Sequence, residues 1–112
     1  MLVQFDRPRG IGLLSNGNVV VGDSGNHRLS IFDQQGSFIK IIGAGQLLDP
    51  FHIFIDSDDR ILVANYSDYG IRILKSSTGN LLKTIPLKST GITMNQNGRI
   101  IASGESHTVS IF

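Results

Sequence analysis

The feature that most constrains the fold is a pattern of short apolar runs that recurs about every 42 residues. Matching positions lie 42 residues apart, as in Pro8 and Pro50, Ile11 and Ile53, and residues 19–21 and 61–63. A third copy begins near Gly91, and residues 109–112 match 29–32 after a one-residue deletion. A unit of this length cannot bury its own hydrophobic faces, so neighbouring units must stack on one another.

Each unit has the pattern of a small antiparallel sheet. In the first unit, β-branched and aromatic residues form four short runs, at 11–14, 19–21, 29–32 and 38–42. Asn16-Gly17 favours a tight hairpin between the first two runs, and residues 22–28 predict a longer turn. Four antiparallel strands in about 35 residues is the size of one propeller blade. The predicted fold class is therefore all-β, with β-propeller blades and about three blades per chain.

The predicted organisation is a single propeller segment over residues 1–112. Repeat 1 covers 8–49, repeat 2 covers 50–89, and repeat 3 covers 90–112 without its fourth strand. Residues 1–7 are a candidate closing strand, because their apolar pattern resembles that of the fourth strands. One hypothesis is that this strand completes a third blade and that two chains form a six-bladed ring. The alternative is that both ends are boundaries within a longer chain.

Composition favours a packed fold with no broad electrostatic preference. The chain is 40% apolar and 17% charged, with a formal net charge of +1, so it has no strong global attraction for nucleic acid or anionic membrane. It has no cysteine, which excludes disulfides and thiolate metal sites. No signal-peptide pattern and no apolar run near 20 residues is present, so we expect a cytoplasmic protein without a membrane partner.

A signature in the first unit resembles the NHL repeat. It comprises residues 8–11, 16–21, 23–29 and 31–32. The family takes its name from an Asn-His-Leu triplet, and here the residues are Asn26, His27 and, one place later, Leu29. Residues 43–47 are similar to the family's segment between blades. The second and third units match by hydrophobic pattern more than by motif.

This resemblance implies a β-propeller that acts as a binding scaffold. NHL modules of this kind often end tripartite-motif ubiquitin ligases, where they present substrates or bind RNA. We expect a protein partner for this chain, with single-stranded RNA on the same face as the alternative. The family also includes a zinc-dependent amidating lyase, which is a third and weaker alternative.

Strand order predicts one face for partner contacts. In a four-stranded meander, the segment before the first strand and the loop between the second and third strands lie on the same face. The formal charges there nearly cancel, but Arg, Tyr and His, which are common at protein interfaces, gather on it. The predicted partner-binding residues are Arg7, Arg9, His27, Arg28, His52, Tyr66, Tyr69 and Lys88.

No residue set points to catalysis, so we expect a protein that is not an enzyme and needs no cofactor. His27, His52 and His107 invite a zinc hypothesis, but they fall at different places in their repeats. Asp56, Asp58 and Asp59 form an acidic run that we interpret as a turn on the opposite face. No Ser-His-Asp set or phosphate-binding loop is present.

The first strand of each unit should line the central channel of the propeller. Alternation predicts that the set Ile11, Leu13, Ile53, Ile55, Ile92 and Met94 faces between blades. Gly12, Phe54 and Thr93 are then the candidates to point into the channel, and strand twist could exchange the two sets.

Overall fold

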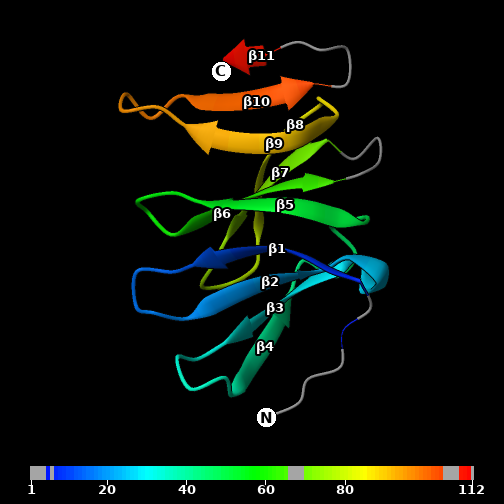
Figure 1. Cartoon of the computed structure of the whole chain (residues 1–112), viewed down its shortest axis with the longest axis vertical. Coiled ribbons are helices and arrows are strands. Elements are labelled where there is room, and N and C mark those ends of the chain that lie inside the picture. Colours follow the sequence, from blue (N-terminus) through cyan, green and yellow to red (C-terminus); the bar gives the residue numbers. More distant parts are fainter. Residues whose placement is uncertain (1–4, 6, 66–69, 105–108, 112) are drawn as a thin grey trace.

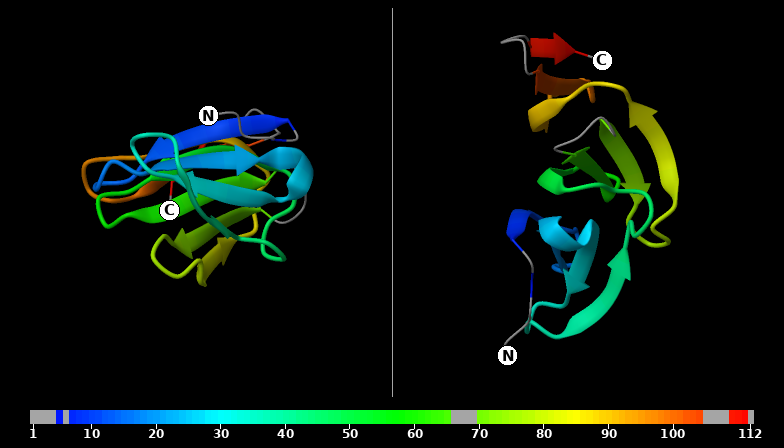
Figure 2. Two further views of the ribbon diagram at one scale, coloured as in Figure 1. Left: turned by 90° about the horizontal axis from the view of Figure 1, so that it is seen from below. Right: turned by 90° about the vertical axis from the view of Figure 1, so that its right-hand side faces the viewer.

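Three antiparallel sheets stand side by side in an open arc (Figures 1 and 2). The computed structural model describes residue 5 and residues 7–65, 70–104 and 109–111. Within these described residues there are eleven strands and one short 3-10 turn. Strands β1, β5 and β9 lie along one side of the arc, and β4 and β8 lie along the other, as in a propeller segment. The described residues contain no helix that is long and apolar enough to cross a membrane.

Blade 1 confirms the predicted meander. It contains β1 (Pro8–Leu13), β2 (Val19–Asp23), β3 (Arg28–Phe32) and β4 (Phe38–Ile42), paired in that order. Gly17, at φ 89°, makes the predicted hairpin turn between β1 and β2. The second loop is shorter than predicted, because β2 continues through Asp23 and β3 begins at Arg28. A 3-10 turn, η1 (Ser24–Asn26), lies between them.

Blade 2 repeats blade 1 in register, and blade 3 has three described strands. Blade 2 contains β5 (Pro50–Ile55), β6 (Arg60–Asn65), β7 (Ile71–Lys75) and β8 (Leu81–Ile85). Pro50 pairs with Asn65 as Pro8 pairs with Asp23, and a register shift follows in both blades. Blade 3 contains β9 (Ser89–Met94), β10 (Ile100–Gly104) and β11 (Val109–Ile111).

The hydrophobic core lies between the blades. One cluster joins β2 and β3 of blade 1 to blade 2 and includes Val20, Leu29 and Ile53, which are at most 5% exposed. A second cluster joins blade 2 to blade 3 through Leu62, Ile92 and their neighbours. Each sheet is therefore stabilised chiefly by the apolar surface it buries against the next sheet.

The inner strands show why the channel prediction was wrong for two residues. A Cβ on Gly12 would lie 2.6 Å from Cγ1 of Ile55, so this position faces blade 2 and not a channel. Phe54 packs against the cluster between blades 2 and 3. The two alternating sets of an inner strand face the two sides of its sheet, toward a neighbouring blade or toward an open end of the arc, and neither set points into a channel. Ile53, Ile55, Ile92 and Met94 pack between blades as predicted.

The described N-terminal residues follow the path of a linker between blades. The Phe5 ring packs edge-on against Phe32, with centroids 5.7 Å apart. Leu47, 42 positions later, lies in the same core cluster as Leu74, the equivalent of Phe32. Arg7, like the equivalent Asp49, has a left-handed backbone, with φ near 52° and 54° respectively. The rest of the predicted closing strand lies outside the described residues, and that strand stays a prediction.

A pair of leucine substitutions tests whether burial between blades stabilises the chain. Leu29 is 0% exposed, whereas Leu82 on β8 is 50% exposed. Leu29→Ala should lower the free energy of unfolding by about 2–5 kcal/mol, because it leaves a cavity in the core. The control Leu82→Ala should change it by about 0.5 kcal/mol or less. Urea unfolding followed by far-UV circular dichroism measures both, and equal losses would contradict the described core.

Candidate functional site

A buried carboxylate organises the loop that carries the signature. Asp23, at the end of β2, is 0% exposed. Its Oδ2 accepts a hydrogen bond from Asn26 Nδ2 at 2.9 Å and one from Arg28 Nε at 3.4 Å. The second contact is also an ion pair, and the Arg28 side chain is 34% exposed. Asp23 thus holds both sides of the short loop, as expected for a buried charge that needs partners.

The same loop fastens blade 1 to the linker that enters blade 2. Ser24 Oγ donates a hydrogen bond to Asp49 Oδ1, and the Asp49 backbone N–H donates to His27 Nδ1 at 2.9 Å. His27 has a left-handed backbone, φ 55°, which turns the chain from η1 into β3. We call Ser24, His27 and Asp49 the loop–linker contact. The histidine of the signature therefore has a structural role, in which one ring nitrogen is already occupied.

The second repeat keeps this arrangement without the signature residues. Asn65 occupies the position equivalent to Asp23 and is 1% exposed. Its Oδ1 accepts a hydrogen bond from the Leu48 N–H at 3.0 Å, and its Nδ2 donates to the Gly70 carbonyl at 2.8 Å. Each of the two repeats therefore has a buried polar side chain at the end of its second strand. Asp23 binds its own loop, and Asn65 binds both its own loop and linker 43–49.

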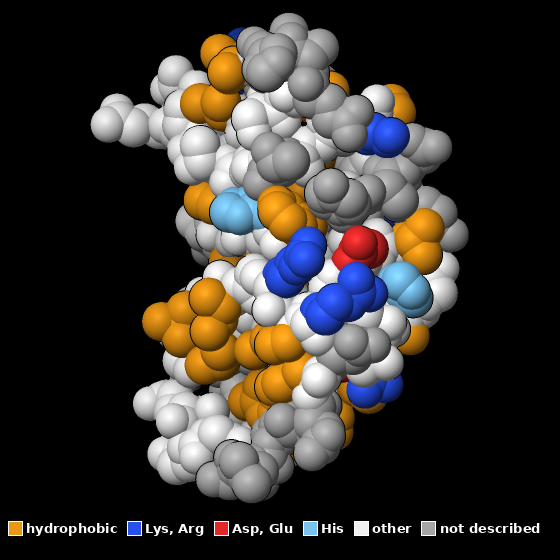
Figure 3. Space-filling view, turned by 45° about the vertical axis from the view of Figure 1, so that its right-hand side comes forward, with side chains coloured by type: hydrophobic (Ala, Val, Ile, Leu, Met, Phe, Trp, Pro, Cys, Tyr) orange, Lys and Arg blue, Asp and Glu red, His pale blue; other side chains and the backbone are white. Residues whose placement is uncertain are grey.

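The side of the arc that carries the loop–linker contact also carries cationic side chains (Figure 3). We call it the signature face, and we define it by η1, the linker end at Asp49, and the segments just before β1 and β9. Arg7 and Arg9 are exposed, and Arg9 Cζ lies 5.3 Å from the centroid of the Phe51 ring on the next inner strand. Lys88, just before β9, is also exposed. The acidic side chains are less exposed than these cations, since Asp23 is buried and Asp49 is half-buried. Among the described residues, the exposed charge on this face is positive.

The predicted site residues divide into three groups. Arg9, His27 and Arg28 belong to blade 1, Arg7 directly precedes it, and Lys88 precedes blade 3. His52 is half-buried, and its Nε2 is 3.2 Å from the Ile92 carbonyl, so it links β5 to β9. Tyr66 and Tyr69 lie outside the described residues. Sequence reasoning missed the Arg9–Phe51 stack and the role of Asp49, because both depend on how adjacent blades meet.

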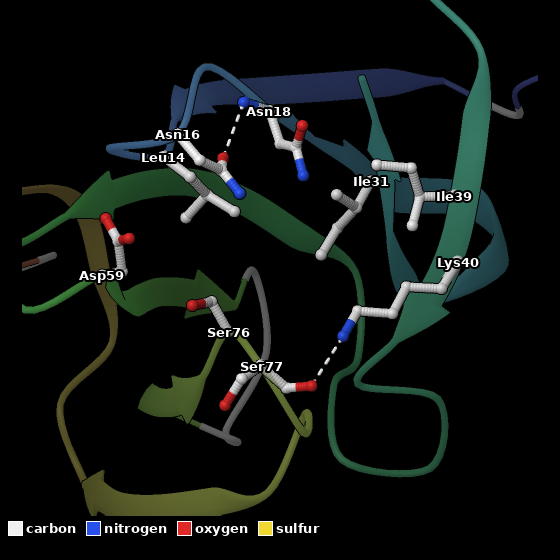
Figure 4. A pocket seen from close by; sticks show the side chains of 9 residues that line it. All are labelled: Leu14, Asn16, Asn18, Ile31, Ile39, Lys40, Asp59, Ser76 and Ser77. Carbon is white, nitrogen blue, oxygen red and sulfur yellow. Dashed lines mark hydrogen bonds between the residues drawn. The ribbon is translucent and has the colours of Figure 1, made fainter. Parts of the chain in front are cut away.

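The opposite face, which carries the hairpins, has a cavity between blades 1 and 2 (Figure 4). Its volume is about 290 Å³, and Lys40 closes one side by donating to the Ser77 carbonyl at 2.7 Å. A cavity of about 200 Å³ lies between blades 2 and 3, with Lys83 in the position of Lys40. Equivalent cavities at successive interfaces follow from the fanning of the blades and do not indicate a ligand.

The acidic run on this hairpin face forms a turn, as predicted. Asp56 is buried and accepts hydrogen bonds from the backbone N–H groups of Asp58 and Arg60, both at 2.9 Å. Asp59 accepts hydrogen bonds from the Ser15 backbone and side chain, at 3.0 and 2.6 Å, and so links blade 2 to blade 1. Among the residues placed by the structure, no group of three His, Asp or Glu side chains converges on a metal position.

Among the solved structures with the same fold is a β-propeller domain. The WD40 propeller domain of Doa1 has a TM-score of 0.78 at 19% identity, over 94% of this chain and 36% of that one. Virginiamycin B lyase from Staphylococcus aureus has a TM-score of 0.70 at 18% identity, over 97% of this chain and 42% of that one. The designed protein Ika4 has a TM-score of 0.56 at 11% identity, over 98% and 92%. At these identities the likeness is one of fold, and the chain is a β-propeller segment.

Sequence comparison adds the family. A family model described as NHL repeat matches residues 5–32. Protein brain tumor from Drosophila melanogaster is 31% identical over 108 residues, which is 88% of this chain and 10% of that protein. RING finger protein nhl-1 from Caenorhabditis elegans is 45% identical over 49 residues, or 39% and 5%. The chain belongs to the NHL-repeat family, and it spans a tenth or less of these relatives.

Two aspartate substitutions separate the buried carboxylate from an exposed one. Asp23→Ala removes the acceptor for Asn26 and Arg28 and should lower the free energy of unfolding by about 1–3 kcal/mol. Asp58 is 77% exposed, so Asp58→Ala should change it by about 0.5 kcal/mol or less. Asp23→Asn should lower the free energy of unfolding by an amount between these two, because repeat 2 has an asparagine, Asn65, at the equivalent position. Chemical denaturation measures all three, and an Asp23→Ala chain as stable as the wild type would contradict this role.

Proposed function

We propose that this NHL-repeat segment is a non-catalytic scaffold that binds a protein partner on its signature face. The observation that carries the proposal is the contrast in exposure between the two kinds of charge there. Arg7, Arg9 and Lys88 are exposed, whereas Asp23 is buried and hydrogen-bonded within the loop. Arginine is enriched at protein interfaces, where its guanidinium binds carboxylates and stacks on aromatic rings.

An acidic segment of a partner protein fits this face best. Among the described residues of this face, the exposed charges are cationic, and they produce a local positive potential although the whole chain carries only +1. Such a potential raises association rates and favours partners of opposite charge. The loop–linker contact holds the loop in place, so little ordering entropy is lost when a partner binds.

The names of the relatives support a ubiquitin-ligase context for the scaffold. One relative is named a RING finger protein and another, ncl-1 from Caenorhabditis elegans, a B-box type zinc finger protein. RING and B-box segments accompany NHL modules in tripartite-motif ligases. We therefore propose that the chain contributes substrate recognition to such a protein, acting in the cytoplasm.

Single-stranded RNA is the second candidate partner, and one contact favours it. The guanidinium of Arg9 lies over the Phe51 ring, which places a cation and an aromatic side chain together beside exposed Arg7. Proteins that bind single strands combine aromatic stacking with positive charge. RNA binding of this kind would weaken steeply with salt.

Paired charge reversals on the two faces test the proposal. Arg9→Glu with Lys88→Glu should abolish retention of proteins that the wild-type chain captures from a cell extract, because it reverses the charge of the signature face. The control, Lys75→Glu with Arg99→Glu, makes the same change in net charge on the hairpin face, where both side chains are exposed. This double variant should still capture the same proteins. Quantitative mass spectrometry of the captured proteins gives the readout, and circular dichroism confirms that each variant is folded.

The same variants distinguish the two partner classes. Equal capture by both double variants would contradict binding on the signature face. If ribonuclease treatment abolishes the capture, the partner on the signature face is RNA and not a protein. In that case a fluorescent uridine-rich oligonucleotide should bind the wild type and the hairpin-face variant, with affinity that falls about tenfold or more between 50 and 200 mM salt.

A further inference from the structure

The two end blades of the arc each leave an apolar face uncovered. We call the side of a blade toward the next blade in sequence its forward face, and the other side its backward face. The backward face of blade 1 presents Ile11, 70% exposed, and Leu13, 66% exposed. The forward face of blade 3 presents Val109, 70% exposed, and Ile111, 58% exposed. Large exposed apolar patches of this kind mark interaction sites.

Inside the chain, the equivalent positions of both faces are covered, and only Ile55, the counterpart of Leu13, is no more than half-buried. Ile53, the counterpart of Ile11, is 5% exposed between blades 1 and 2. Ile71 and Ile73, the counterparts of Val109 and Ile111, are 0% and 6% exposed between blades 2 and 3. Each uncovered face is thus one half of an interface that the chain already forms twice.

The shape of the forward face of blade 3 agrees with this match. It is hollowed by a cavity of about 320 Å³, which is lined by Gly91, Thr93, Ile101 and Val109 and reaches His52 of β5 at its inner edge. Thr93 is the counterpart of Gly12, whose added Cβ would lie 2.6 Å from Cγ1 of Ile55 in the next blade. At the first interface, the next inner strand therefore fills the corresponding space. In blade 3 among the described residues, that space is open.

We propose that a second copy of this chain covers both faces by packing head to tail. The forward face of blade 3 in each copy packs against the backward face of blade 1 in the other, so Leu13 and Ile11 enter the hollow beside Thr93. None of the side chains named on these faces is charged, so the contact buries no unpaired ion. The interface continues the register of the two interfaces within the chain.

Blade number favours two copies over three. Head-to-tail contacts form closed rings when the rotation per subunit allows it, and otherwise form open filaments. Propellers typically close with about 4–8 blades. Two copies of this three-sheet arc give six blades, inside that range, whereas three copies give nine. A two-copy ring contains two identical interfaces, and once the first has formed, the second closes within the same complex.

Solution mass tests this inference on the 112-residue chain. Light scattering and sedimentation equilibrium over a concentration series should show twice the 12.2 kDa mass of one chain. Ile11→Asp and Val109→Asp each place a carboxylate in both interfaces and should raise the dissociation constant about 100-fold or more. Leu82→Asp, on the outer strand β8 at 50% exposure, is the matched control and should leave the dimer intact.

Mixing the two interface variants identifies the head-to-tail arrangement. An Ile11→Asp chain retains its forward face, and a Val109→Asp chain retains its backward face, so a mixed pair has one intact interface. Differently tagged variants should therefore associate with each other more tightly than either does with itself. A pairing of two backward faces would instead be broken by Ile11→Asp alone.

Three outcomes would overturn the inference. One is a folded single chain at every concentration, and another is a dimer that neither aspartate variant weakens. The third is growth into assemblies larger than two copies, because the contact would then fail to close a ring. Circular dichroism of the variants shows whether each chain is folded, and both substituted side chains are at least 70% exposed in the single chain.

Discussion

Burial of apolar surface between successive sheets is the constraint on which this structure depends. Each sheet is too small to cover either of its own faces, and Val20, Leu29 and Ile61 are fully buried only because a neighbouring sheet lies against them. The 42-residue recurrence in the sequence is a direct result, because the same positions must be apolar in each unit. Blade 2, covered on both sides, is the centre of the arc (Figure 2).

The signature residues add polar contacts between blades at one edge of this apolar packing. Asp23 fixes the short loop, and Ser24 and His27 connect the loop to Asp49, where the chain enters the next blade. These polar contacts set the position of one blade relative to another, which apolar packing alone leaves less defined. They also bury Asp23 and partly bury Asp49, so among the described residues the exposed charge on the signature face belongs to cations such as Arg7, Arg9 and Lys88. The residues that define the family thereby shape the surface available to a partner.

The fold could be predicted from the sequence because blade packing is periodic. Hairpin residues such as Gly17 and the apolar runs located β1 to β4 within a few residues. The site was harder to predict from the sequence, because formal charge does not distinguish the buried Asp23 from an exposed aspartate. The Arg9–Phe51 stack and the contact of His52 with Ile92 join residues of different blades and depend on their relative placement. Gly12 was misplaced because alternation alone does not reveal that the two sets of side chains on an inner strand face the two sides of the sheet and not the channel.

Amide hydrogen exchange measured strand by strand tests the central claim most directly, that burial between blades holds each sheet. The Ile11→Asp chain is suited to it, because the outer faces of its end blades stay uncovered. The account predicts the slowest exchange in β6 and β7 of blade 2, and faster exchange in blades 1 and 3, which are covered on one face. Equal protection in all three blades would show that cover on a second face adds no protection, and would contradict the account.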